Sequence, residues 1–529
     1  MGKVLKLFKK DAIKSFFTSI ANNDLSVYMF VGGASDHASN TTVNENTQES
    51  VHRAQREMMF GKQLMTAGAD ISTNANGFAY MTRRIDWANN TIYNFYDDAN
   101  SNIYNSDNNF YVVSNATASG QSKSVYKCIW NNGGAASRID PSVSQSNNPT
   151  GGAFTTTDGY TWVYMYTIDD PSWNKFATST KMPVFANNIS VAAANDGINF
   201  IKVENAGSGY VVIKGTIAAV INSTTFQITS NSSVISSGLN AYQNSYLYIV
   251  SSASIVSNTF LRRITDSYID IYNLVYVRTD VPIDSVSQVA NNYASFQIGP
   301  YCKVEGDGTN ASAWANVSSS NTINSITMLN KGAGYTRATV TIYNQFNGGS
   351  GATARALISP PKGHGANPML ELGVDTMGVY AQFSNNDTNI TPGITYNTVG
   401  LIIDPKNRAT PTTKFSNGSF SQMMSVNLNS VPALSNNELL VGNGHIGYFV
   451  KVGPYTQSAY IVGDKAFANG ESFYGAIAGN TTTYTITGIN TYGDLDPVLS
   501  DVVYINNLSG NGITRSTSSN EEIKLAIQF

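Results

Sequence analysis

Apolar and polar residues alternate with a period of two along most of the chain, which is the pattern of half-buried β-strands. The clearest example begins at Tyr160, where every second residue is large and apolar. These residues are Tyr160, Trp162, Tyr164, Tyr166 and Ile168. Similar short segments, such as TFQITS, SYLYIV and IDIYNLVYV, are separated by Gly, Asn and Ser turns. The pattern predicts a chain built mainly of β-strands.

Two segments have helical spacing instead. In residues 12–21, apolar side chains recur at i, i+3, i+4 and i+7, which predicts a helix with one apolar stripe. A second helix is predicted over residues 49–65, where the spacing is less regular. We therefore expect a mainly β protein made of several β-sandwich or β-barrel-like modules, with a short N-terminal helix and few other helices.

One segment occurs twice. INFIKVENAGSGY (198–210) and INSITMLNKGAGY (323–335) share isoleucines, an Asn, two glycines and a final Tyr, and each leads to a run of small residues. The glycines allow turn conformations that other residues avoid. Residues 212–298 interrupt the first copy and contain enough alternating segments for a small β-domain. We interpret the pair as a structural module rather than a ligand-binding repeat, because no charged residue recurs.

The length of 529 residues allows three or four domains. The predicted divisions are an N-terminal core (1–197), a glycine-tyrosine repeat module (198–362) with an inserted β-domain (212–298), a segment returning to the core (363–406), an appended β-module (407–500) and C-terminal core strands (501–529).

The composition favours extended protein contacts. Charged residues make up 13% of the chain, about half of the usual ~25%. Tyrosine is abundant, and Asn, Ser, Thr and Gly supply most of the remaining polar groups. Such a surface suits subunit interfaces, where aromatic groups add contact area and charges cost desolvation. An uncharged β protein without such interfaces is the plainer alternative.

Several partners and compartments are not expected. The net charge is −3 and basic residues do not cluster, so no nucleic-acid groove is predicted. Lysines interrupt the N-terminal apolar residues, so neither a signal peptide nor a membrane span is expected. Cys128 and Cys302 form no metal or disulfide framework, which fits synthesis in a reducing cytoplasm.

Enzymatic motifs are weak. The four histidines lack metal-ligand spacing, and no cofactor or metal site is predicted. Residues 442–447 match G-x-G-x-x-G, but a strand-like segment follows where a helix would be needed, so a hairpin turn is favoured over a dinucleotide site. Acidic pairs occur at Asp97–Asp98, Asp169–Asp170 and Asp494/Asp496. These acids are interpreted as solvated turn residues, although paired carboxylates can also cleave glycans.

Arg83, Arg84, Asp86 and Trp87 form a dense local group, MTRRIDWANN. One interpretation is a structural network in which the indole packs beneath a guanidinium group. The other is an anchor at a subunit contact, because Arg and Trp dominate interface hot spots. Tyr160, Trp162 and Tyr164 are the corresponding candidates on the aromatic strand, as core or interface residues.

Several of these segments resemble the dimeric baseplate wedge subunit of contractile-tailed, myovirus-type bacteriophages. They occur in the family's order. They are the N-terminal helix followed by LSVYMFVGGASDHA, then MTRRIDWANNTIY, VYKCIW, DGYTWVYMYTI, KMPVF, GLIIDPK, and the C-terminal VVYINN and EEIKLAIQF. The likeness covers roughly residues 4–185, 395–406 and 501–529, whereas residues 198–359 and 407–500 are elaborations of a smaller core.

The resemblance implies a non-enzymatic structural protein of the virion tail baseplate, assembled in the host bacterial cytoplasm. Such subunits form a homodimer within each wedge, bind other wedge subunits and help to transmit the change that triggers sheath contraction. Membranes, nucleic acid and cofactors are not implied as partners. The alternative is a tail-associated glycan-binding or glycan-cleaving protein, motivated by the aromatic faces and acidic pairs.

Overall fold

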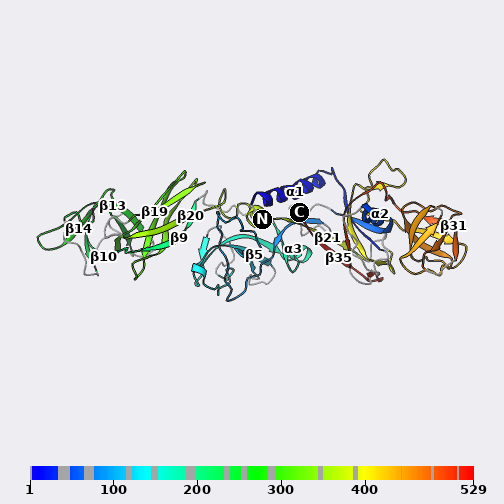
Figure 1. Cartoon of the computed structure of the whole chain (residues 1–529), viewed down its shortest axis with the longest axis horizontal. Helices are drawn as coiled ribbons and strands as arrows, with labels where there is room; N and C mark the ends of the chain where they lie inside the picture. Colours follow the sequence, from blue (N-terminus) through cyan, green and yellow to red (C-terminus); the bar gives the residue numbers. More distant parts are fainter. Residues whose placement is uncertain are drawn as a thin grey trace. The chain divides into compact units, whose positions relative to one another are not determined.

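The computed structural model describes most of the chain, which divides into two compact units (Figure 1). The described residues are 3–33, 48–64, 77–114, 122–143, 153–185, 197–230, 239–251, 259–283, 294–343, 349–384, 391–442, 444–477, 482–508 and 512–529. The first unit comprises Met1–Lys3, Ile85–Thr167 and Phe185–Leu372, and the second comprises Val4–Arg84, Ile168–Val184 and Gly373–Phe529. The chain is 53% strand and 9% helix, which confirms the mainly β prediction.

The second unit contains a five-stranded antiparallel sheet built from distant parts of the chain. Its order is β25 (Ser419–Ser421), β2 (Met58–Leu64), β1 (Val27–Gly32), β23 (Thr398–Ile403) and β33 (Asp501–Asn507). All six residues of β1, which pairs with β2 and β23, are buried, so both faces of the sheet are covered at this strand.

The predicted helix over residues 49–65 is wrong in its second half. Helix α2 (Gln48–Glu57) ends where β2 begins, and β2 pairs with β1. The physical reason is tertiary. Phe420 of β25 packs so closely over Gly61 that a side chain at residue 61 would overlap its ring, and Met58, Met59 and Phe60 are buried in the sheet.

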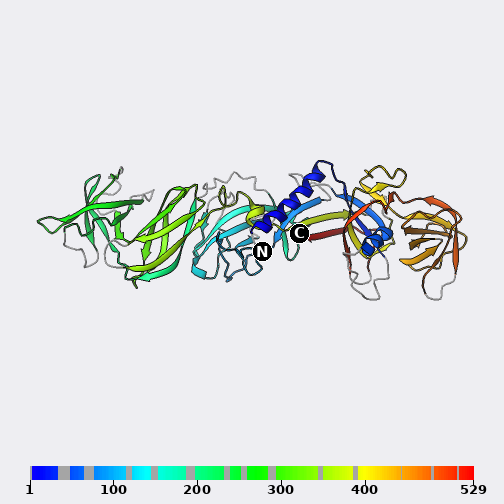
Figure 2. The ribbon, with the colours of Figure 1, turned by 45° about the horizontal axis from the view of Figure 1, so that its top comes forward.

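A four-stranded sheet in the second unit carries helices on both faces (Figure 2). Its order is β35 (Glu521–Gln528), β21 (Thr376–Phe383), β3 (Gly77–Arg83) and β8 (Lys181–Val184). Helix α1 (Lys3–Ala21) includes the predicted segment 12–21, and its Phe17 contacts Tyr80 with ring centroids 4.8 Å apart. On the other face, Phe176 of α3 (Asp170–Phe176) contacts Tyr380.

A closed barrel completes the second unit. Its order is β26 (Met424–Leu428), β29 (Ser458–Gly463), β28 (His445–Val452), β27 (Glu438–Gly442), β30 (Ser472–Gly475) and β31 (Thr483–Thr491). Two-stranded ladders join β22 (Thr395–Tyr396) to β34 (Ile513–Thr514) and β24 (Lys406–Asn407) to β32 (Leu495–Asp496). The G-x-G-x-x-G match is the β27–β28 hairpin, in which Gly442 pairs with His445, so the hairpin prediction is confirmed.

The first unit begins with a four-stranded sheet around an aromatic core. Its order is β4 (Tyr111–Ser114), β5 (Ser122–Asn131), β7 (Tyr160–Asp169) and β6 (Ala153–Thr155), and the 3₁₀ turn η2 (Asn132–Gly134) follows β5. The core consists of the buried residues Tyr93, Val112, Tyr126, Cys128, Tyr160, Trp162 and Tyr164. Helix α4 (Pro368–Glu371) is also in this unit.

The two glycine-tyrosine repeats form one nearly closed six-stranded sheet. Its order is β18 (Ile323–Ala333), β17 (Thr309–Val317), β16 (Tyr301–Gly306), β19 (Ala338–Tyr343), β20 (Ser350–Ile358) and β9 (Ile198–Ser208). The first copy supplies β9, β16 and β17, and the second supplies β18, β19 and β20. The copies exchange strands, because β9 pairs with β20 and β18 pairs with β17.

The shared glycines and tyrosines have the same structural role in both copies of the repeat. Gly207 and Gly332 have positive φ angles of 60° and 63°. Tyr210 and Tyr335 are both buried. The Tyr210 hydroxyl accepts a hydrogen bond from the Ala352 N–H of β20 at 3.2 Å, and the Tyr335 hydroxyl accepts one from the Ala311 N–H of β17 at 3.4 Å. In each copy, the tyrosine therefore bonds to the paired strand of the other copy: Tyr210 next to β9 bonds to β20, and Tyr335 next to β18 bonds to β17.

The segment between β9 and β16 forms a closed barrel. Its order is β10 (Ile213–Asn222), β11 (Thr225–Ser230), β14 (Val275–Thr279), β13 (Thr259–Ile269), β12 (Tyr246–Ser251) and β15 (Ala294–Gly299). Alternate residues such as Ile217, Phe226, Leu247 and Phe296 fill its core. Closure pairs both edges of this inserted module.

We predict that Gly332→Ala destabilises the repeat module far more than Gly334→Ala. Both glycines have positive φ, but a Cβ at Gly332 would meet the Thr309 carbonyl oxygen and lie 2.7 Å from the Ala311 nitrogen, whereas Gly334 has open space. The expected costs are about 3 kcal/mol or more for Gly332→Ala and about 1 kcal/mol for Gly334→Ala. Hydrogen exchange of the β18 amides measures both, and equal costs would contradict the packing argument.

Candidate functional site

The predicted aromatic residues of β7 lie in the core of the first unit. Tyr160 and Trp162 are fully buried, and Tyr164 is 3% exposed. Tyr160 stacks on Trp162 with centroids 5.5 Å apart, and its hydroxyl donates a hydrogen bond to the Ala135 carbonyl oxygen at 2.5 Å. The Tyr164 hydroxyl lies 2.7 Å from the Thr167 hydroxyl. These side chains hold the four-stranded sheet together.

The predicted Arg-Arg-x-Asp-Trp group divides between the two units. Arg83 and Arg84 belong to the second unit, in which the Arg84 guanidinium lies 4.7 Å from the Trp173 ring centroid and donates to the Thr178 carbonyl oxygen at 2.9 Å. Asp86 and Trp87 belong to the first unit. The backbone of Asp86 bridges to Val113, and the Trp87 indole N–H donates to the Ser137 hydroxyl at 3.2 Å.

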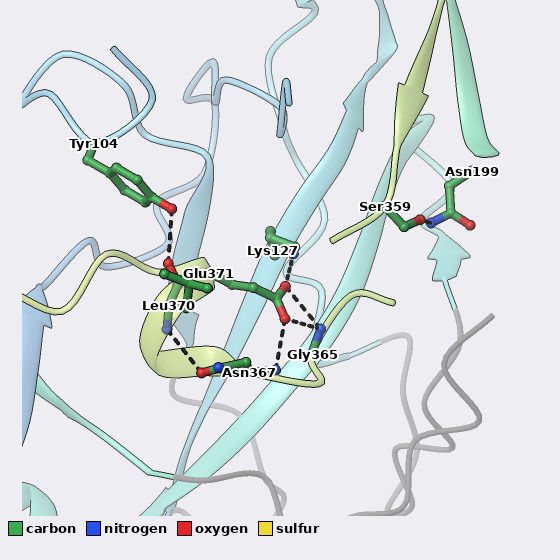
Figure 3. Close-up of polar contacts among 8 residues, drawn as sticks. All are labelled: Tyr104, Lys127, Asn199, Ser359, Gly365, Asn367, Leu370 and Glu371. Atoms are coloured by element: carbon green, nitrogen blue, oxygen red, sulfur yellow. Dashed lines mark hydrogen bonds and ion pairs between the residues drawn. The ribbon is translucent and has the colours of Figure 1, made fainter. Parts of the chain in front are cut away.

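A polar cluster in the first unit, of which Figure 3 shows Tyr104, Lys127 and Glu371, was not predicted from the sequence. We call it the α4 cluster, and it comprises Tyr96, Tyr104, Lys127, His364 and Glu371. The Lys127 ammonium forms an ion pair with the Glu371 carboxylate, and both side chains are almost wholly buried. Burying such a pair is costly unless the remaining lone pairs are satisfied.

The local fold satisfies the Glu371 carboxylate. Its Oε1 accepts hydrogen bonds from the Gly365 N–H at 2.9 Å and the Asn367 N–H at 3.1 Å. Gly365 has a φ of 85°, which lets the chain turn back over the carboxylate. Asn367 then begins α4, because its side chain accepts a hydrogen bond from the Leu370 N–H. The local fold therefore positions the Glu371 carboxylate to neutralise the buried Lys127 ammonium.

His364 closes the cluster. Its ring meets the Tyr96 ring edge-on with centroids 5.1 Å apart, and the Lys127 ammonium lies 4.8 Å from the same Tyr96 ring. His364 is 7% exposed, and its Nδ1 has no hydrogen-bond partner among the residues that the structure describes. Burial, and then the nearby positive charge of Lys127, hold the pKa of His364 well below its usual value of 6.5. The imidazole is therefore neutral in the folded protein.

A pocket of about 220 Å³ adjoins the cluster. It is lined by Tyr96, Tyr104, Pro360, Pro361, Lys362, Ala366, Asn367, Leu370 and Glu371. The Tyr104 hydroxyl donates to the Leu370 carbonyl oxygen at 2.9 Å, and burial raises the pKa of both tyrosines. The volume is below the roughly 300–1,000 Å³ of typical ligand sites. The lining contains a single carboxylate, whereas glycan cleavage generally uses two.

Five of the six acids in the acidic pairs have hydrogen-bond or ion-pair partners among the described residues. Asp97 and Asp98 bind the Arg355 guanidinium at 2.6 and 3.2 Å, and burial raises the pKa of Asp98. Asp169 accepts a hydrogen bond from the Ser172 N–H and caps α3. Asp494 accepts from the Ser421 N–H at 2.8 Å, and Asp496 accepts from the Val498 N–H at 3.1 Å. These acids therefore stabilise turns and strand junctions.

One sequence signal points to the α4 cluster. In the segment VYKCIW, Lys127 is a lone charge among apolar residues of β5, and a buried lysine needs a partner. Nothing in the sequence identifies Glu371 as that partner, because 244 positions separate the two residues. Their pairing depends on the fold of the first unit.

No group of three or more His, Cys, Asp or Glu side chains in the described part of the chain is arranged to hold a metal ion. No described helix combines the length and apolar character needed to cross a membrane.

Comparison with known proteins identifies no relative. No protein-family model, curated protein or solved structure matches the chain.

Removing the cation of the α4 cluster is expected to destabilise the first unit strongly. Lys127→Met leaves the Glu371 carboxylate buried and uncompensated, at a cost of about 3–5 kcal/mol. Lys127→Met combined with Glu371→Gln removes both charges and keeps an oxygen acceptor for Gly365 and Asn367, so this double variant should be more stable than Lys127→Met alone. Hydrogen exchange of β5 amides measures both, and a double variant less stable than the single one would refute the pairing energetics.

The first unit should lose stability at acidic pH because of His364. The lowered pKa means that the unfolded chain binds a proton below about pH 6.5 while the folded chain does not, so stability falls as pH falls. Relative to His364→Phe, the wild type should lose about 2 kcal/mol between pH 8 and pH 5. Denaturant unfolding of both proteins at the two pH values tests this. The same pH dependence in both would show that His364 is not the group responsible.

Proposed function

We propose that this chain is a structural subunit of a bacteriophage tail baseplate, of the wedge type found in contractile tails. It acts as a homodimer that also binds neighbouring wedge subunits. Its work is done through interfaces, during tail assembly and during the conformational change that triggers sheath contraction. This role requires no cofactor, nucleic acid or membrane, and its place is the virion baseplate after assembly in the host cytoplasm.

The observation that carries the proposal is how the segments with the family likeness fold together. β1, β23 and β33 come from LSVYMFVGG, GLIIDPK and VVYINN, and they are consecutive neighbours in one sheet although they lie in three distant parts of the chain. β3, which ends in the first three residues of MTRRIDW, shares the four-stranded sheet with β8 from KMPVF and β35 from EEIKLAIQF. If these segments belong to a core shared with the wedge subunits, we expect them to occur in the same order along the chain and to pack next to one another in the fold.

The elaborations support the same proposal. Residues 213–299 and 424–491 form closed barrels, each with its own apolar core. The first barrel exposes large apolar side chains on its turns, including Leu239, Ile271 and Tyr272 at 77%, 89% and 75% exposure. Exposed aromatic and aliphatic residues are typical of protein contact surfaces. These modules suit contacts with neighbouring subunits.

Immunogold electron microscopy tests the location. An antibody raised against the purified chain should label the baseplate end of contractile tails in particles from the lysate in which the chain is produced. Label confined to capsids, or to material that is not particle-bound, would count against the proposal. The mass of the purified chain in solution provides the second measurement, and a strict monomer at micromolar concentration would contradict the homodimer.

A further inference from the structure

The outer edge of β35 is built for pairing with the same strand of a second copy. We propose that two chains join antiparallel along β35, so that the two four-stranded sheets become one sheet of eight strands across a two-fold axis. The inference rests on the proposed homodimer and names its interface. It follows from the position, length and sequence of β35.

β35 lies at one margin of the four-stranded sheet, beside β21 (Figure 2). The Phe529 N–H donates to the Asp375 carbonyl oxygen at 3.0 Å, which continues the β21–β35 ladder by one pair. Backbone groups alternate in direction along a strand, so odd-numbered residues of β35 bond to β21 and even-numbered residues point outward. The outward residues are Glu522, Lys524, Ala526 and Gln528. No described strand pairs with this side.

The other margin of the same sheet is protected. β8 has four residues and contains Pro183, which has no N–H to donate. Short strands and prolines are the usual means of preventing edge-to-edge association. β35 has eight residues and no proline. The contrast singles out β35 as the edge open to strand addition.

The sequence of β35 is compatible with itself in an antiparallel pair. With the two-fold axis at Leu525, Ile523 faces the second copy's Ile527, and Lys524 faces its Ala526. Glu522 faces Gln528, so no like charges are directly opposed. In this register the even-numbered residues of one strand face even-numbered residues of the other. These are the residues whose backbone N–H and C=O groups point outward, so the two strands can form hydrogen bonds with each other.

The two faces of the sheet fit this join. Leu525 is buried, and Ile523 and Ile527 are half-buried on the same face, so pairing would extend one apolar stripe across the axis. Glu522, Lys524 and Ala526 are exposed on the opposite face. A strand from a different protein could form the same backbone hydrogen bonds, but the side chains of β35 specify a pairing register only with a second copy of β35. Self-pairing therefore explains both the backbone and the side-chain pattern.

Proline substitution at Ala526 provides the first test. Ala526→Pro removes an outward N–H without removing any N–H that bonds to β21, and the two-fold axis doubles the loss. We expect the dimer dissociation constant to rise about tenfold or more, measured by sedimentation, whereas Ala526→Ser should leave it unchanged. Circular dichroism and hydrogen exchange of β21 confirm that each variant is folded.

Cysteine cross-linking provides a second test that does not depend on the proline variant. Leu525→Cys places two thiols directly opposite each other at a non-hydrogen-bonded pair, within disulfide reach. Ala526→Cys places them diagonally and is the matched control. The native Cys128 and Cys302 are buried and should not interfere. Under mild oxidation, Leu525→Cys should give a covalent dimer on non-reducing gels, and Ala526→Cys should not.

The outcomes separate this inference from the proposed function. A wild-type dimer whose affinity is unchanged by Ala526→Pro, or in which Leu525→Cys does not cross-link, overturns the β35 interface and leaves the baseplate proposal standing. Affinity lost in Ala526→Pro without cross-linking would indicate a strand from a different register or protein, and also overturns it. A monomeric wild type overturns both the interface and the homodimer.

Discussion

Backbone hydrogen bonding between segments far apart in the chain is the constraint on which the second unit depends. β23 lies between β1 and β33, so residues near 30, 400 and 505 must meet before that sheet exists. Forming such pairs closes long loops, which costs conformational entropy. The barrel formed by residues 424–491 lies within one of these connections, and a module whose strands close on themselves adds length without adding an unpaired edge.

The first unit shows how polar groups are accommodated in an aromatic protein with few charges. Lys127 and Glu371 are buried together, and the backbone N–H groups of Gly365 and Asn367 satisfy the carboxylate. Arg355 gathers Asp97 and Asp98 in the same unit. These charges have specific partners, so one arrangement of the chain is favoured over alternatives of similar apolar burial.

Local patterns in the sequence predicted much of the architecture. Period-two alternation identified β7, and the apolar stripe of residues 12–21 identified part of α1. The glycines of the repeat predict turn conformations; Gly207 and Gly332 do have positive φ angles, but they lie inside the strands β9 and β18 rather than in turns. These features depend on neighbours within a few residues. The helix predicted over residues 49–65 failed at Met58, because pairing with β1 outweighs a weak local preference. The sequence left open whether the seven candidate anchor residues are structural or interface residues, and it could not show that the Arg-Trp group divides between the two units or that Arg84 lies over Trp173.

The sequence by itself therefore determined the class of secondary structure and the repeat, since both are encoded in short-range periodicity and in residue identity. Only the tertiary structure decided the exchange of strands between the repeats, the partner of Lys127 and the edge position of β35. Those features depend on contacts between residues more than a hundred positions apart. For such contacts, the backbone offers many equivalent pairings, and the choice among them is made by packing and burial over the whole unit.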